Sequence, residues 1–171
     1  SISDALELTL NLSPEELTQK WRTFLQGLQL EGGQPEASEV SLPGGTLSVT
    51  AREGEVAYAT LKQRAIRYYL YSGGQMYELA GSWPWLLSYE EPSVPMAFSP
   101  EGQLAWVSYD QEGPILWLLN RQQGAYRQHP LSLRSVHSLA WEGENTLWLS
   151  ALGDDGQVSL YTFGVGGGSL R

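Results

Sequence analysis

Few residues in this sequence have the types and spacing that metal or redox chemistry requires. Cysteine is absent, and the two histidines, His129 and His137, stand eight positions apart. That spacing matches no common pair of zinc ligands. The run Asp154-Asp155-Gly156 has the oxygen donors of a calcium loop, but no distal glutamate completes the pattern, so we interpret it as a hairpin turn. We therefore expect no metal site.

Nucleophilic, acid–base and phosphate chemistry also lack their usual patterns. No Gly-x-Ser-x-Gly elbow occurs in the chain. The acidic pairs Glu15-Glu16 and Glu90-Glu91 are sequence neighbours; on a strand such neighbours point to opposite faces, and they need not share a site. The glycine-rich run 164–168 leads into no helix, as a phosphate-binding loop would. We expect no catalytic residues, no cofactor and no enzymatic activity.

Aromatic residues are abundant, with seven tryptophans and nine tyrosines in 171 residues. Most are expected in the core of a β-protein, where aromatic side chains are enriched. Trp83-Pro84-Trp85 lies in a connecting segment, residues 80–95, where the indoles either fill a seam between structural units or contact a partner or ligand. The candidate partner-binding residues are Trp83, Trp85, Tyr89, Trp21 and Phe24.

Charge and hydropathy argue against nucleic acids and membranes as binding partners. The net charge is −9, and no run of lysine and arginine occurs. Nucleic acids and anionic membrane surfaces both require such a basic footprint, so neither is an expected partner. No stretch approaches the roughly 20 apolar residues of a membrane span, and no signal peptide is visible. We expect a cytoplasmic protein.

The first 33 residues are predicted to form a strand followed by a helix. Leucines alternate with polar residues over 6–12, which is typical of a half-buried strand. Ser13-Pro14-Glu15-Glu16 is a strong helix start, and Trp21 and Phe24 belong to an apolar stripe that follows at helical spacing. This stripe packs on the rest of the chain or docks on a partner. The polar residues 34–44 are predicted to be a linker.

Residues 45–163 contain three similar units, predicted at 45–81, 94–132 and 136–163. Shifting the chain by 43 residues places Trp106 on Leu149 and Trp117 on Leu160 without a gap. A shift of about 48 places Tyr58 under Trp106, and Ile66 under Ile115 with one residue of slip. Short apolar strands alternate with Gly-bearing turns in each unit, four strands in the first two, which is typical of an antiparallel β-repeat. Residues 164–171 are expected to be a flexible tail.

The units "VPMAFSPEGQLAWVS" and "VHSLAWEGENTLWLS" resemble WD40 and related bacterial β-propeller repeats. The resemblance implies a mainly β fold of propeller-like, four-stranded antiparallel blades, preceded by the strand–helix unit. Trp117-Leu118 and Leu160-Tyr161 stand where that family has Trp-Asp, and no Gly-His dipeptide occurs. The family's Asp–His–Ser/Thr–Trp network is therefore expected to be absent or degenerate.

Three blades are fewer than a closed propeller contains, so an apolar blade face is expected at each end of the stack. The strand–helix unit, a second copy or another subunit could cover these faces. We therefore expect a non-catalytic interaction or scaffold subunit that binds a protein partner, as a homo-oligomer or within a larger complex. Two alternatives remain open: a small-molecule binder of the lipocalin or bilin-handling kind, built as a β-barrel or sandwich, and an accessory propeller domain of a larger enzyme.

Overall fold

The computed structural model describes residues 42–84, 94–120 and 124–171. The chain divides into two units, Ser1–Ser41 and Leu42–Arg171, and the description concerns the second. The strand–helix unit predicted for residues 1–33 lies outside the described residues. Within them the protein is mainly β, as predicted, and it consists of four-stranded antiparallel sheets.

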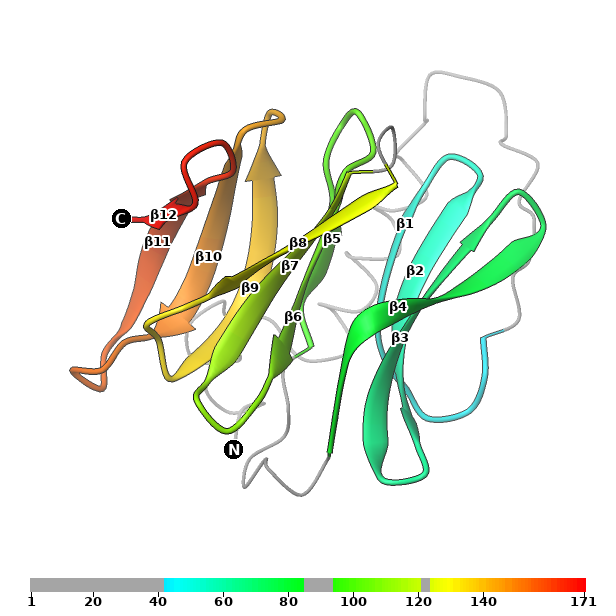
Figure 1. Cartoon of the computed structure of the whole chain (residues 1–171), viewed down its shortest axis with the longest axis horizontal. Helices are drawn as coiled ribbons and strands as arrows, with labels where there is room; N and C mark the ends of the chain where they lie inside the picture. The colour runs from blue at the N-terminus through cyan, green and yellow to red at the C-terminus, as the bar shows by residue number, and fades with distance from the viewer. Residues whose placement is uncertain (1–41, 85–93, 121–123) are drawn as a thin grey trace, which may run out of the picture. The chain divides into compact units, whose positions relative to one another are not determined.

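Twelve strands in the described residues form three sheets, each made of four consecutive strands (Figure 1). Blade 1 contains β1 (Thr46–Arg52), β2 (Glu55–Lys62), β3 (Ala65–Ser72) and β4 (Gln75–Pro84). Blade 2 contains β5 (Met96–Phe98), β6 (Leu104–Tyr109), β7 (Pro114–Asn120) and β8 (Ala125–Pro130). Blade 3 contains β9 (Ser135–Glu142), β10 (Thr146–Leu152), β11 (Val158–Gly164) and β12 (Ser169–Leu170).

The observed strand register differs from the alignment of the three units that was made from the sequence. Trp106 pairs with Trp117, and Leu149 pairs with Tyr161. Because Trp106 and Leu149 are equivalent, Trp117 is equivalent to Tyr161 and not to Leu160. The turn between β10 and β11 is one residue longer than its counterpart in blade 2, which an ungapped comparison misses. The slip inferred for blade 1 is also wrong, since Tyr58 pairs with Tyr69 and a constant shift of 48 aligns both strands.

The predicted flexible tail is instead the fourth strand of blade 3. Phe163 pairs with Leu170 and Gly164 with Ser169, and the amide and carbonyl of Arg171 bond those of Thr162 at 2.9 Å. Gly168, at a φ of +60°, lies in the turn that reverses the chain. Glycine-rich composition therefore marked a tight hairpin here.

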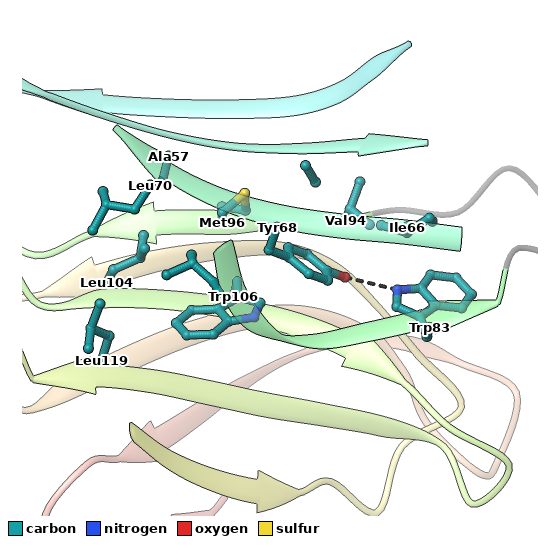
Figure 2. Packing of buried hydrophobic residues seen from close by; sticks show 12 residues of the cluster. Ala57, Ile66, Tyr68, Leu70, Trp83, Val94, Met96, Leu104, Trp106 and Leu119 are labelled. Atoms are coloured by element: carbon teal, nitrogen blue, oxygen red, sulfur yellow. Dashed lines mark hydrogen bonds between the residues drawn. The ribbon is translucent and has the colours of Figure 1, made fainter. Parts of the chain in front are cut away.

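Blades 1 and 2 enclose one core between their faces (Figure 2). Trp106 is fully buried there and donates its indole N–H to the carbonyl of Ala80 at 3.1 Å. In the same seam, Trp83 donates to the hydroxyl of Tyr68 at 2.9 Å, and that hydroxyl donates to the carbonyl of Val107 at 2.7 Å. Burial raises the pKa of Tyr68 against the lowering effect of the Trp83 hydrogen bond, so the phenol stays neutral.

Blades 2 and 3 enclose a second core and are also joined at one end of the seam by Glu144. Its carboxylate accepts from the Ser99 hydroxyl at 2.6 Å and from the Glu101 amide at 2.7 Å. Desolvation raises the pKa of the Glu144 carboxyl, but these hydrogen bonds, a third from Gln103 and the charge of Arg52 outweigh it, and the pKa is lowered. The ionised form of Glu144 thus links the turns of two blades.

We expect the stabilising effect of Glu144 to disappear in acid. Because its pKa is lowered in the folded protein, its contribution is present above the pKa of the unfolded chain and is lost as the pH falls through the folded value. Urea unfolding of the wild type and of Glu144→Gln, between about pH 7 and pH 3, measures the effect. The wild type should be more stable at neutral pH, and the two curves should converge in acid. A difference independent of pH would contradict this role.

Candidate functional site

The outer face of blade 3, which points away from blade 2, is the first candidate site. Trp148 and Leu160 are equivalent to Ala105 and Leu116 of blade 2, as the strand pairings show. Ala105 and Leu116 are 0% exposed because they pack against blade 3, whereas Trp148 is 39% exposed and Leu160 is 70% exposed. Val158, on the same face, is 62% exposed. This face corresponds to the side of blade 2 that is covered by the next blade.

The composition of this face differs from that of a blade core. Ser150 and Thr162 occupy the positions of Val107 and Leu118. Trp148 donates its indole N–H to a carboxylate oxygen of Glu142 at 2.9 Å on the open surface. Trp141 and Leu149, by contrast, pack into the core between blades 2 and 3. A tryptophan surrounded by polar groups is typical of a protein–protein interface.

A hollow at the seam of blades 1 and 2 is the second candidate site. It has a volume of about 460 Å3 and lies between the end of β4 and the turn that joins β6 to β7. Its lining residues are Ser82, Trp83, Pro84, Tyr109, Asp110, Gln111 and Glu112. Two aromatic rings and two carboxylates therefore meet in a space within the size range of small-ligand sites.

The aromatic side chains of this hollow are fixed by hydrogen bonds. The rings of Trp83 and Tyr109 lie 5.0 Å apart with a 52° tilt. The Tyr109 hydroxyl donates to the carbonyl of Val136 at 3.2 Å and accepts from the Val136 amide at 2.9 Å. Burial raises the pKa of Tyr109, partly offset by the Val136 hydrogen bond, so the ring stays neutral. The hollow thus has an uncharged, rigid floor.

Of the candidate residues predicted from sequence, Trp83 is the one that the structure describes. It is 4% exposed, packs in the core between blades 1 and 2, and lines the hollow with the small part that remains accessible. Trp21, Phe24, Trp85 and Tyr89 lie outside the described residues, so their assignment to partner binding stays a prediction. Sequence analysis missed Tyr109, Asp110 and Glu112, which approach Trp83 only because blades 1 and 2 stack.

The described residues contain neither a cluster of metal ligands nor a membrane-spanning helix. Across residues 42–84, 94–120 and 124–171, no three histidine, aspartate or glutamate side chains converge as metal ligands would. In those same ranges no helix has the length and apolar character needed to cross a bilayer.

Comparison with known proteins supports the fold. No protein-family model and no curated protein matches the chain. Among solved structures, the β-propeller domain of the Trilobed protease from Pyrococcus furiosus, described as having an open velcro topology, matches with a TM-score of 0.54 at 13% identity. A puromycin-hydrolysing peptidase from Mycobacterium tuberculosis matches with a TM-score of 0.52 at 16% identity.

These matches establish propeller-like blades and nothing about activity. Each covers 74% of this chain, but the chain spans 40% of the first structure and 20% of the second. At such low identity the shared property is the fold. The expectation of propeller-like blades is confirmed, and the described residues form three separate open sheets instead of one closed barrel.

Proposed function

We propose that this chain is a non-catalytic interaction module whose propeller-like blades bind a protein partner through the outer face of blade 3. The exposure of Trp148, Val158 and Leu160 carries the proposal, because their equivalents in blade 2 are buried by the next sheet. The contact between blades 2 and 3 therefore shows how another sheet could cover the outer face of blade 3. The partner is a protein that presents a further antiparallel β-sheet to this face, as blade 3 does to blade 2.

A second copy in head-to-tail contact fits this face less well than a different protein. Within the chain, the residues equivalent to Trp148 are alanines: Ala57 belongs to the same core as Trp106, and Ala105 belongs to the same core as Leu149. On blade 3 the equivalent residue is Trp148. The residue that blade 1 would bring against it is Tyr58, which is large and already 2% exposed. Two large rings at one position would overpack the contact, so we assign the partner sheet to another protein.

The comparisons concern the fold and the share of a propeller that this chain spans. The chain spans less than half of the propeller domain that it matches, so most of that domain has no counterpart among these residues. One matching structure is described as a domain of a protease and the other as a peptidase. This specific observation favours a second candidate function, namely an accessory propeller segment that assists a separate hydrolytic domain.

Substitution of Leu160 by glutamate tests the interaction face. The wild type should bind an apolar fluorescent dye at this face, and Leu160→Glu should remove most of the signal while changing the free energy of unfolding by less than about 0.5 kcal/mol, as an exposed position allows. Tyr77→Glu is the matched control, because Tyr77 is 48% exposed on the outer strand of blade 1. If the wild type and Leu160→Glu bind the dye equally, the outer face of blade 3 is not the proposed apolar interaction surface.

Sedimentation and activity measurements separate the remaining functions. If the chain sediments as a monomer at micromolar concentration, the result supports a partner that is a different protein. If it sediments as a dimer and Leu160→Glu disrupts that dimer, the outer face of blade 3 mediates self-association. Chromogenic aminoacyl and peptide substrates should remain uncleaved by the purified chain. Cleavage above the rate without protein would overturn the non-catalytic assignment, and stimulation of an added peptidase would favour the accessory function.

A further inference from the structure

Hydrogen bonds fix the side chains that line the hollow between blades 1 and 2. Its floor consists of Trp83, held by a buried hydrogen bond to Tyr68, and Tyr109, held by two partly buried hydrogen bonds to Val136. Asp110 accepts the amides of Glu112 and Gly113 at 2.8 and 3.1 Å through one carboxylate oxygen. The acidic turn is thereby fixed beside the aromatic floor. A ligand would meet these groups without first ordering them.

The described lining of the hollow is negatively charged. Asp110 and Glu112 are exposed carboxylates, and no arginine or lysine among residues 42–84, 94–120 and 124–171 forms an ion pair with either. The remaining lining residues are neutral. Aromatic faces attract cations, and carboxylates pair with ammonium and guanidinium groups, so both features favour the same kind of ligand.

The other blades show that an acidic turn alone does not create this arrangement. The equivalent turn of blade 3 carries Asp154 and Asp155, and Asp155 caps it by accepting the Gln157 amide at 3.0 Å. The residue equivalent to Tyr109 is Leu152 in blade 3 and Leu61 in blade 1, as the pairing of β2 and β10 shows. In blade 2 the carboxylates lie beside a tyrosine at the end of the second strand, whereas the tyrosine that approaches the acidic turn of blade 3, Tyr161, comes from the third strand.

We propose that the hollow binds an organic cation, an alkylammonium or guanidinium group of the kind carried by lysine and arginine side chains. Asp110 and Glu112 pair with the charge, while Tyr109 and the accessible part of Trp83 contact the alkyl chain or the guanidinium plane. The site is independent of the outer face of blade 3 and does not rest on the function proposed for that face.

Titration with capped amino acids, followed by NMR, tests the site. The probes are N-acetyl-arginine amide and N-acetyl-lysine amide, with N-acetyl-citrulline amide as the uncharged analogue. The backbone amides of Gln111 and Glu112 and the indole N–H of Trp83 should shift and saturate with a Kd on the order of 1 mM, since exposed cation–π and ion pairs are individually weak. Citrulline should produce no saturable shift. Agmatine, a free amine with the same guanidinium group, shows whether the ligand is a side chain or a free amine.

Paired acid-to-amide variants provide the decisive comparison. Asp110→Asn with Glu112→Gln should weaken binding about fivefold or more, and the asparagine can still accept the turn amides. The matched control is Asp154→Asn with Asp155→Asn, which removes the same charge from blade 3 and should leave the Kd unchanged. Binding by the wild type should also weaken as salt is raised. No saturation by about 20 mM, equal binding of citrulline, or equal loss in both double variants would overturn the proposal.

Discussion

Replacing Trp106 with alanine is expected to lower the free energy of unfolding by about 3–5 kcal/mol, which is a large part of the stability of a domain. Trp106 is fully buried between blades 1 and 2. Its ring stacks on Trp117 at 6.0 Å and meets the edge of Tyr126 at 5.9 Å. The substitution therefore leaves a cavity at the seam and also removes the donor to the carbonyl of Ala80.

Trp148→Ala is the control for this prediction, because it deletes the same side chain from an exposed position. Trp148 makes one surface hydrogen bond, to Glu142. Its replacement by alanine should lower the free energy of unfolding by no more than about 1 kcal/mol. Equilibrium unfolding in urea, with the m-value compared between variants, measures both changes. Similar losses for the two variants would show that the seam between blades 1 and 2 is not a stabilising core.

The strands and turns could be predicted from sequence because they depend on local patterns. Alternating apolar residues and Gly-bearing turns repeat through residues 45–163, and each such pattern coincides with an observed hairpin. The final hairpin was missed because its second strand, β12, has only two residues and glycine dominates the turn before it. Composition alone does not distinguish such a turn from a flexible tail.

The position of each side chain relative to neighbouring blades could not be predicted from local patterns. Trp141, Leu149 and Trp148 have similar hydrophobicity, yet the first two face the core and the third faces outward. Trp148 and Leu149 are adjacent on β10 and point to opposite faces, but which of these faces is covered depends on how the sheets stack. For Leu160, on β11, one extra residue in the preceding turn also shifts the alignment of the units. A register error of one residue moves a side chain to the opposite face of a sheet.

The seam hollow could not be predicted for a related reason. Trp83 was identified as a residue of interest, but its neighbours Tyr109 and Asp110 come from the next blade. Their approach depends on how two sheets stack, which has no signature in either segment. The Asp–His–Ser/Thr–Trp network was expected to be absent or degenerate, and one hydrogen bond of that kind is present, from Trp117 to the hydroxyl of Ser108 at 2.8 Å.

Replacing Gly81 with alanine should disrupt this hydrogen bond and lower the free energy of unfolding by about 2–5 kcal/mol. Two costs add at this position. Gly81 has a φ of +87°, which favours glycine over every residue with a side chain. A Cβ atom here would lie 2.7 Å from Nε1 of Trp117 and 3.0 Å from Oγ of Ser108, so the indole or the strand must move.

Gly74→Ala separates the two costs. Gly74 has a similar φ of +78°, but a Cβ atom there would have no heavy atom within 4 Å. Its substitution should cost only the backbone term, about 1–2 kcal/mol. The excess loss in Gly81→Ala then measures how tightly the Trp117 indole lies against β4, and an altered indole N–H signal of Trp117 should accompany it. If both variants lose the same stability and that signal is unchanged, Trp117 has room to move, and the contact between blades 1 and 2 is looser at β4 than these distances indicate.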